Sequence, residues 1–367
     1  MAGQAGHEPE ASRGAHSAQG TQGSRSTHAG HAGHEPAVSP VALWGAMLIL
    51  YLVWGSTYLF IAISVQTIPP FVMASVRFLI SGGILLGWIA LRQRGALRSL
   101  TRRELRDSAI VGALLLGGGM GLVAWGELTA PSSIAALLIA MMPVWVALLG
   151  RIFLGERLPW ITAAGIALGF AGVVILVWPG DLSTAGAEPA AIGALILSPI
   201  CWATGSLYAA HRARLPRNPS LATSLQMLFG SLTLAVVALL TGELVGFDPA
   251  SISTASAISF VYLTLVGSLI AYSAFVWLLR VAPLPLVATY AYVNPAVAVV
   301  LGALVLDETL TPRALLAGGI IVAAVAIIVT TRGRLRGRRI VHQDEEPASI
   351  DDAPRPANQA LPVDAEA

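Results

Sequence analysis

The chain of 367 residues contains no lysine and one cysteine, and charged side chains make up only 11% of it. A soluble domain carries about 25% charged residues, so this composition is a poor fit to a water-exposed surface. The lone Cys201 excludes an intrachain disulfide and a metal site built from several cysteines. The net charge of +2 is too small to indicate a nucleic-acid partner. Hydrophobic residues, by contrast, make up 55% of the chain, which is typical of a membrane protein.

Long apolar segments fill the middle of the sequence. Crossing the hydrocarbon layer takes a helix of about 20 apolar residues, because unpaired peptide groups find no water there. Ten stretches meet this length: 41–64, 70–91, 108–127, 131–150, 159–178, 189–210, 220–241, 256–279, 285–306 and 313–331. They predict an all-α integral membrane protein with ten transmembrane helices and the lipid bilayer as its surroundings.

The second half of the chain repeats the first at an offset of 152 positions. The matched residues are Trp125 with Trp277, Ala130-Pro131 with Ala282-Pro283, Pro143 with Pro295, Gly150 with Gly302, Leu154 with Leu306, Glu156 with Glu308 and Leu158 with Leu310. Five spans per copy force the second copy to enter the membrane upside down. We therefore predict two inverted five-helix repeats, 41–178 and 189–331, an arrangement typical of transporters that alternate access to a site at the bilayer midplane.

The two ends of the chain differ from this middle part. Residues 1–40 are rich in Gly, Ala, Ser and His, and in the second tail, 332–367, residues 340–367 are acidic and rich in Pro and Ala. Such segments bury too little apolar surface to offset chain entropy, so we predict disordered tails. His28, His31 and His34 recur every third residue, but the composition favours a solvated low-complexity tail over a metal site.

Arginine is distributed unevenly between the two sides of the predicted helices. One side holds Arg92, Arg94, Arg98, Arg102, Arg103, Arg106, Arg212, Arg214, Arg217, Arg332, Arg334, Arg336, Arg338 and Arg339. The opposite side holds Arg313 with Asp181, Glu188, Glu243 and Asp248. Because cytoplasmic loops carry the excess of basic residues, both termini are predicted to be cytoplasmic.

Several short motifs appear in a fixed order along the chain. They are Trp54-Gly55-Ser56-Thr57-Tyr58, Pro70…Arg77-Phe78, Pro131…Pro143…Leu154-Gly155-Glu156, Gly267-Ser268…Tyr272, Ala288-Thr289-Tyr290-Ala291-Tyr292-Val293-Asn294-Pro295 and Asp307-Glu308-Thr309-Leu310. Together with the duplication, they resemble the EamA-type members of the drug/metabolite transporter superfamily, near the bacterial drug/metabolite exporter branch. The resemblance covers residues 41–331. It implies a ten-helix inner-membrane carrier in which spans one to four and six to nine surround a central cavity and spans five and ten brace it.

The expected function is secondary transport of a small-molecule substrate. The resemblance implies export of small metabolites, amino acids or amphiphilic drugs by alternating access, with proton coupling or facilitated flow left open. No cofactor is expected. Gly165 and Gly169 form a small-residue face for helix contact within or between molecules, so monomer and homodimer both stay open. The alternatives are an intramembrane enzyme and a lipid-binding or sensory membrane protein; no nucleophile–base or metal motif supports the enzyme.

Aromatic residues and prolines indicate where a solute binds. Tyr51, Trp54 and Tyr58 share one face of the first span, too deep for an interfacial belt, and packing explains such a stripe as well as a cavity does. Pro143 and Pro295 predict kinks at equivalent places in spans four and nine. The predicted solute-binding residues are Trp54, Tyr58, Met141, Pro143, Trp202, Trp277, Tyr290, Asn294 and Pro295.

Three acidic residues and one arginine complete the set of candidates. Arg77 is the one charge clearly inside a predicted span, about 10 Å deep on helix rise. Since a charge in hydrocarbon needs a partner, we predict an ion pair with Glu127 or a polar network shared with it, serving as a structural strap or in gating or substrate contact. Glu156 and Glu308 follow spans four and nine, and are predicted to cap the starts of spans five and ten.

Overall fold

Prolines mark the beginnings of most helices in the computed structural model, which describes residues 39–344 except 157, 179–186, 283, 288 and 310. A proline at the first helical position loses nothing, because the first N–H groups of a helix have no partner within it. α1 (Pro40–Ser64), α2 (Pro70–Arg92), α10 (Pro189–His211) and α11 (Pro219–Leu240) begin in this way. The predictions for residues 1–38, which include His28, His31 and His34, lie outside the described residues.

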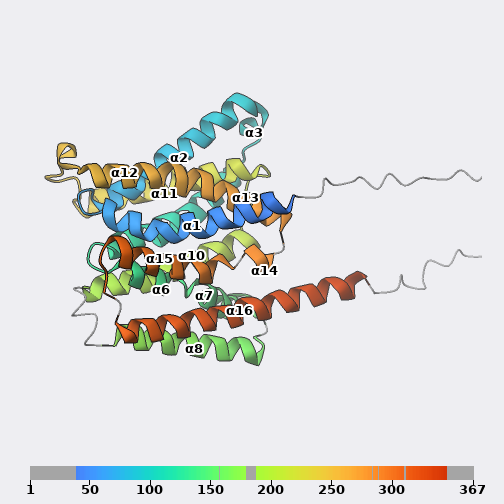
Figure 1. Cartoon of the computed structure of the whole chain (residues 1–367). Coiled ribbons are helices and arrows are strands. Elements are labelled where there is room, and N and C mark those ends of the chain that lie inside the picture. Colours follow the sequence, from blue (N-terminus) through green and yellow to red (C-terminus); the bar gives the residue numbers. More distant parts are fainter. Residues whose placement is uncertain are drawn as a thin grey trace, which may run out of the picture. The chain divides into compact units, whose positions relative to one another are not determined.

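The described chain is built of helices and their connections (Figure 1). The remaining elements are α3 (Arg94–Arg98), α4 (Arg102–Gly112), η1 (Ala113–Met120), α5 (Gly121–Gly126), α6 (Ser132–Ile139), α7 (Met142–Leu154), α8 (Trp160–Val177), η2 (Pro249–Ser251), α12 (Thr254–Tyr262), η3 (Leu263–Ile270), α13 (Ala271–Val281), α14 (Leu284–Val287), α15 (Tyr290–Val305) and α16 (Pro312–Asp344). η1 and η3 are π-helical turns inside longer helices, and η2 is a short 3₁₀ turn.

Nine of the described helices are long and apolar enough to cross a membrane. They agree with nine of the ten predicted spans. The predicted span 285–306 is divided between two helices, α14 and α15. Within α15, the segment Val293–Val305 is a shorter apolar helix. At the C-terminal end, α16 continues to Asp344 and thus extends into the segment that was predicted to be disordered from residue 332. Arginine and leucine are good helix formers, which is why the helix continues beyond the apolar segment.

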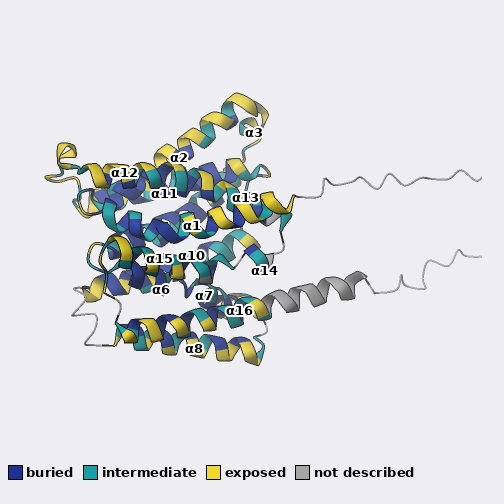
Figure 2. Cartoon of the chain, viewed as in Figure 1, coloured by how far each residue is buried: buried dark blue, intermediate teal, exposed yellow. Residues whose placement is uncertain are grey.

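The outer faces of the helices expose large apolar side chains (Figure 2). Trp44, Leu79, Trp160 and Leu304 are each more than half exposed. Contiguous apolar surface of this kind marks contact with a membrane or another protein. The exposure of these apolar side chains therefore agrees with the membrane environment that the hydropathy of the sequence predicts.

α8 and α16 lie side by side at one edge of the bundle (Figure 1). Their contact depends on glycine: a Cβ on Gly165 would lie 2.9 Å from Ile328 of α16, and one on Gly172 would lie 2.8 Å from Ile321. The small-residue face of α8 thus packs against another helix of the same molecule. The sequence had left open whether this face makes contacts within one molecule or between molecules.

The glycine run in η1 also allows close packing between helices. A Cβ on Gly117 would lie 2.8 Å from the Thr233 side chain, and one on Gly118 would lie 2.9 Å from Cys201. The backbone of η1 therefore approaches α11 and α10 closely, as expected for a glycine segment that packs against neighbouring helices.

The turns that end α7 and α15 have the same geometry. Gly155 has φ 65° and Asp307 has φ 51°, and these two residues are equivalent in the sequence repeat. The N–H of Glu156 donates to Gly150 at 3.3 Å, and the N–H of Glu308 donates to Gly302 at 3.2 Å. Both helices thus end in the same left-handed turn, which is common at helix C-termini.

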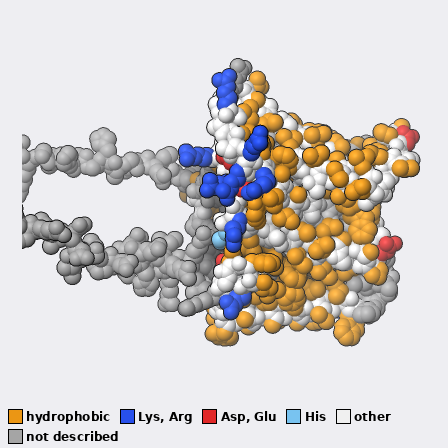
Figure 3. Space-filling view, turned by 180° about the vertical axis from the view of Figure 1, so that it is seen from behind, with side chains coloured by type: hydrophobic (Ala, Val, Ile, Leu, Met, Phe, Trp, Pro, Cys, Tyr) orange, Lys and Arg blue, Asp and Glu red, His pale blue; other side chains and the backbone are white. Residues whose placement is uncertain are grey.

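Charged side chains separate to the two ends of the bundle (Figure 3). Exposed arginines gather at one end: Arg92, Arg98, Arg102, Arg103, Arg106, Arg151, Arg212 and Arg214. The exposed acidic residues Glu188, Asp248 and Asp307 belong to loops at the opposite end. The helices therefore have one basic and one acidic end.

Candidate solute-binding cavity

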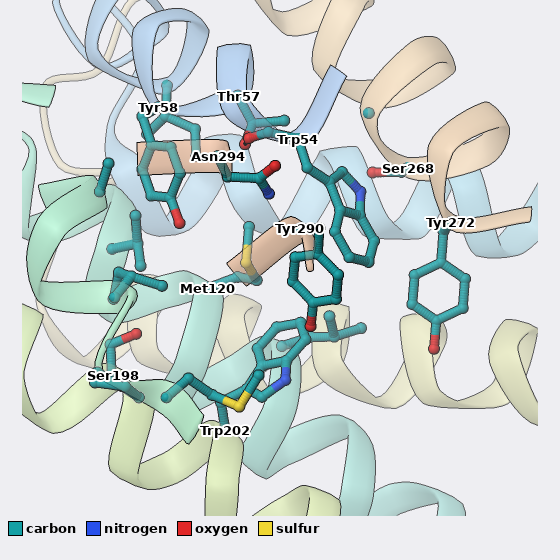
Figure 4. A pocket seen from close by; sticks show the side chains of 18 of the residues that line it. Trp54, Thr57, Tyr58, Met120, Ser198, Trp202, Ser268, Tyr272, Tyr290 and Asn294 are labelled. Carbon is teal, nitrogen blue, oxygen red and sulfur yellow. Dashed lines mark hydrogen bonds between the residues drawn. The ribbon is translucent and has the colours of Figure 1, made fainter. Parts of the chain in front are cut away.

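A cavity of about 130 Å³ lies at the centre of the helices (Figure 4). Its volume is comparable with the ~150 Å³ cavity that admits benzene in another protein. Side chains from α1, α2, η1, α5, α6, α7, α10, α11, η3, α13 and α15 line it, together with Ala140 between α6 and α7. α8 and α16 contribute none of the lining, which is the arrangement that the family resemblance implied.

Six of the nine predicted solute-binding residues line this cavity. They are Trp54, Tyr58, Trp202, Tyr290, Asn294 and Pro295. They come from α1, α10 and α15, three helices that are far apart in sequence. The fold therefore brings together the aromatic face of the first span and the Asn-Pro segment of the ninth.

The other three predicted residues lie elsewhere. Met141 is buried against α8, where its sulfur is 3.2 Å from the position of a Cβ on Gly169, and Met142 lines the cavity in its place. Pro143 follows at the start of α7 and is not part of the lining. Trp277 packs into a core cluster with Met47 and other apolar residues. These three residues therefore lie outside the cavity lining, although their neighbours in sequence or in the fold contribute to it.

One wall of the cavity is a set of interlocking aromatic rings. The Trp54 ring is 5.1 Å from Tyr290 in an edge-to-face arrangement and 5.1 Å from Phe275, and Tyr272 lies 6.0 Å from Phe275. Edge-to-face contacts of this kind stabilise a pair beyond its buried area and restrict the rings. Since these residues come from α1, α13 and α15, the wall joins the two halves of the chain.

Asn294 is held by backbone carbonyl groups. With the amide assigned so that its donors face acceptors, the side-chain nitrogen donates to the carbonyl oxygens of Tyr51, at 3.3 Å, and Tyr290, at 3.2 Å. Both amide hydrogens are engaged in this orientation, which leaves the amide oxygen as the group that Asn294 offers to a solute. A donor on the solute is therefore the natural partner of Asn294.

The two π-helical turns border the cavity at corresponding places. Leu116 and Met120 of η1 line it, as do Gly267 and Ser268 of η3. A π-helical turn interrupts the regular hydrogen-bond pattern of the helix. A hydroxyl group of a neighbouring helix binds one carbonyl group of η1, since the Ser198 hydroxyl donates to the carbonyl oxygen of Gly119 at 2.7 Å. π-helical turns are frequent at functional sites, although their periodicity is not visible in an apolar sequence.

Arg77 lines the cavity without the predicted ion pair. It is 4% exposed, its Nε donates to the Ser268 hydroxyl at 2.9 Å, and its guanidinium lies 5.1 Å from the centre of the Phe78 ring. Among the described residues, no Asp or Glu lies within 4.0 Å of the Arg77 guanidinium. The prediction that Arg77 pairs with Glu127 is therefore wrong, because Arg77 turns toward η3 rather than toward the end of α5.

Glu127 is buried at the C-terminal end of α5. It is 5% exposed, and neither of its carboxylate oxygens has a hydrogen-bond partner among the residues that the structure describes. Met120 and Val123 line the cavity, and Glu127 follows them at helical spacing on the same face. A carboxyl group in such surroundings is favoured in its neutral form, since burying an unpaired charge is costly.

Glu308 caps a helix other than the predicted one. Its carboxylate accepts from the backbone N–H and hydroxyl groups of Ser132 (2.7 Å each) and Ser133 (3.1 and 2.5 Å) at the start of α6. A carboxylate at a helix N-terminus satisfies unpaired N–H groups and suits the helix dipole. The expectation that Glu308 caps the last span is thus replaced by a link from the second half of the chain to the first. Glu156 lies half-buried in the equivalent turn after α7.

Asp107 is a buried residue that the sequence reasoning missed. It accepts hydrogen bonds from the Arg106 side chain at 2.8 Å, the Tyr208 hydroxyl at 3.0 Å and the backbone N–H of Arg214 at 2.7 Å. These contacts join α4 to the end of α10 and the loop that follows. A single Asp inside a strongly basic segment was the available signal for such a hub.

The missed lining residues include Phe78, Met120, Ser268 and Tyr272. Ser268 and Tyr272 belong to a motif that carried the family resemblance, so their spacing was a usable signal. Among the described residues, no group of three or more His, Cys, Asp or Glu could hold a metal ion. The arrangement is suited to enclosing a small amphiphilic molecule, because a mostly apolar pocket with a few placed polar groups binds such ligands.

Comparison with known proteins agrees with this geometry. The model of the EamA-like transporter family matches residues 43–178 and again residues 189–330. Over 289 residues the chain is 38% identical to the "Uncharacterized inner membrane transporter YedA" of Escherichia coli (strain K12), covering 78% of this chain and 90% of that protein. It is 28% identical over 307 residues to a "Probable terminal-alkyne amino-acid exporter" of Streptantibioticus cattleyicolor, covering 81% and 95%.

A solved crystal structure shares the fold with a TM-score of 0.54 at 20% identity, covering 79% of this chain and 99% of the other. The two family matches span most of the chain, and the transporter names of the relatives agree with them. The chain therefore belongs to the EamA-like transporter family, and it is a multi-pass inner-membrane transporter rather than an enzyme.

Proposed function

We propose that this transporter exports small amphiphilic metabolites, amino acids or drugs from the cytoplasm by alternating access, with the central cavity as the binding site. The cavity itself carries the proposal. It is lined by both halves of the chain, and aromatic rings and a few polar groups surround a space the size of a small organic molecule. Small-molecule sites are usually of this kind.

Two inverted five-helix repeats are part of the proposal. Supporting observations are the two family matches and the identical left-handed turns at Gly155 and Asp307. If α14 and α15 together form the ninth span, each repeat has five. Exchanging the conformations of two such repeats turns one central site from one side of the membrane to the other.

Links between the halves exist at both ends of the bundle. At the acidic end Glu308 of the second half binds the start of α6, and at the basic end Asp107 of the first half accepts from the backbone of Arg214. Alternating access requires that one set of links opens while the other stays closed. We expect these two links to open in turn during transport.

The arginine-rich end is proposed to face the cytoplasm, with both termini on that side. The segregation of charge between the two ends supports this orientation. Reporter fusions at Arg98 and Arg217 should report the cytoplasm, and fusions at Asp248 and Arg313 should report the periplasm. A reversed pattern would refute the orientation.

The test of the function uses purified protein in liposomes, with matched variants on one helix. Trp54→Ala removes part of the aromatic wall, whereas Trp44→Ala changes an exposed residue of α1. An aromatic contact contributes about 0.5–1.5 kcal/mol beyond its buried area, and a hydrogen bond contributes about as much, so Trp54→Ala and Asn294→Ala should each lower transport at subsaturating solute by up to about 10-fold. Trp44→Ala should transport like the wild type.

Two results would contradict the proposal. If Trp54→Ala and Asn294→Ala are folded and transport like the wild type, the cavity is not the solute site. If the wild type moves no amino acid, amphiphilic drug or metabolite from a broad panel, a lipid-binding or sensory role becomes the better explanation.

A further inference from the structure

Arg77 is the one charged residue among the described side chains that line the cavity. No Asp or Glu of the described residues belongs to the lining. A guanidinium stays charged at any physiological pH, so this apolar cavity carries one positive charge. Within the described part of the chain, that charge has no acidic partner within 4.0 Å.

One edge of the Arg77 guanidinium makes a hydrogen bond, and the donors of its other edge make none with the described residues. Its Nε donates to Ser268 at 2.9 Å, and Phe78 lies against it. A Cβ on Gly267 would lie 3.2 Å from one Nη atom, so the absence of a side chain there makes room for the group. The Nη groups donate to no acceptor among the described residues. Four of the five N–H donors are therefore left for a ligand.

A buried, unpaired charge is costly in a membrane and is retained where it has a function. The planar fork of a guanidinium matches the two oxygens of a carboxylate, and such pairs form two parallel hydrogen bonds. A cationic solute, by contrast, would meet a like charge in a low-dielectric space without an acidic residue in the lining to compensate. The cavity thus discriminates between solutes by charge.

Given that the cavity is the transport site, as proposed above, we propose that Arg77 binds the carboxylate of the transported solute. The apolar part of the solute then lies against Trp54, Tyr58 and Trp202, which line the same cavity. The Asn294 amide oxygen faces the solute as an acceptor, so an amino group beside the carboxylate is accommodated. The substrate class is an amphiphilic carboxylate, amino acids included, rather than a cationic amphiphile.

The experiment compares four probes that share one ring and differ in charge: phenylacetate, phenylalanine, phenylacetamide and phenethylamine. The first readout is thermal stabilisation of the purified transporter in detergent, which is free of passive leakage. The second is uptake into liposomes, with protein-free liposomes subtracted. We expect phenylacetate or phenylalanine to bind and move at least about 30-fold better than the amide or the amine, the order of effect seen when a buried charge loses its partner.

Three variants complete the design. Arg77→Gln should abolish the preference for carboxylates, and Arg77→Lys should keep part of it, since lysine retains the charge but not the fork. Arg92→Gln, an exposed arginine at the far end of the same helix, should behave like the wild type. If Arg77→Gln does not fold, the wild-type probe series and Arg77→Lys decide the question.

The outcomes separate this inference from the proposed function. Equal binding and transport of phenethylamine or phenylacetamide by the wild type would overturn the assignment of Arg77 while leaving transport through the cavity intact. Failure of all four probes, together with failure of the broad solute panel, would count against the cavity as a transport site. An undiminished carboxylate preference in folded Arg77→Gln would also overturn the assignment.

Discussion

Replacing Glu308 with alanine is expected to destabilise the protein by separating its two halves at one end. The Glu308 carboxylate accepts four hydrogen bonds from Ser132 and Ser133 at the start of α6. Two of the four donors are backbone N–H groups, which cannot turn toward another acceptor. The two serines are 0% and 2% exposed, so water cannot replace the lost carboxylate.

The size of the effect follows from these two N–H groups. A buried donor left without a partner costs about 1–3 kcal/mol, so the pair gives a loss of about 2–6 kcal/mol in the free energy of unfolding, and we expect about 3. The serine hydroxyls can rotate toward backbone carbonyl groups and add little. Glu308→Gln keeps one acceptor oxygen and should lose about half as much.

Glu243 offers a matched control. It caps the start of α2 through two backbone N–H groups, those of Phe71 at 3.2 Å and Val72 at 2.9 Å, and no hydroxyl groups take part. Val72 is less buried than the two serines, so water can reach one of the released groups. Glu243→Ala should therefore cost about half as much as Glu308→Ala.

The assay is reversible unfolding in mixed micelles of detergent and sodium dodecyl sulfate, followed by circular dichroism. If Glu308→Ala lowers the free energy of unfolding by less than about 1 kcal/mol, or by no more than Glu243→Ala does, then Glu308 does not hold α6 in solution. A double-mutant cycle with Ser133→Ala adds a direct measure, because residues in contact show coupling of about 0.5–3 kcal/mol.

Two further predictions concern packing and charge. A Cβ on Gly112 would lie 2.3 Å from the carbonyl oxygen of Gln226, so Gly112→Ala should push α4 away from α11 and lower the free energy of unfolding by at least about 1–3 kcal/mol. A Cβ on Gly83 would meet open space, so Gly83→Ala should leave the stability unchanged. Equal thermal stability of the two variants would contradict this prediction. Arg77 and Glu127 do not form an ion pair. The effects of Arg77→Ala and Glu127→Ala on the free energy of unfolding should therefore be additive to within about 0.5 kcal/mol in the double variant. A coupling energy above about 1 kcal/mol would show that the two residues are partners.

Local sequence patterns anticipated much of the helical structure. The predicted spans 41–64, 70–91 and 189–210 agree closely with α1, α2 and α10. These segments could be predicted because hydropathy and proline act within a few residues of where they occur. The predicted span 285–306 was less successful, since α14 ends at Val287 and α15 begins at Tyr290, while Pro295 lies inside α15.

The cavity residues show where local patterns stop being sufficient. Trp54 and Tyr58 were found because α1 is unbroken, so that a helical spacing places both on one face. Met141 was misplaced because the helix is interrupted between α6 and α7, and one residue of shift rotates a side chain by about 100°. Met142 therefore reaches the cavity and Met141 packs against α8.

The sequence by itself determined the membrane environment, the duplication and the separation of charge between the two ends. Each of these properties is a sum over many residues, and no single contact decides it. The tertiary structure alone decided the partners of the few buried charges: Glu308 with the start of α6, Asp107 with Tyr208 and Arg214, and Arg77 with Ser268. Such partners are distant in sequence, and which one a side chain meets depends on how the helices are rotated and packed against each other.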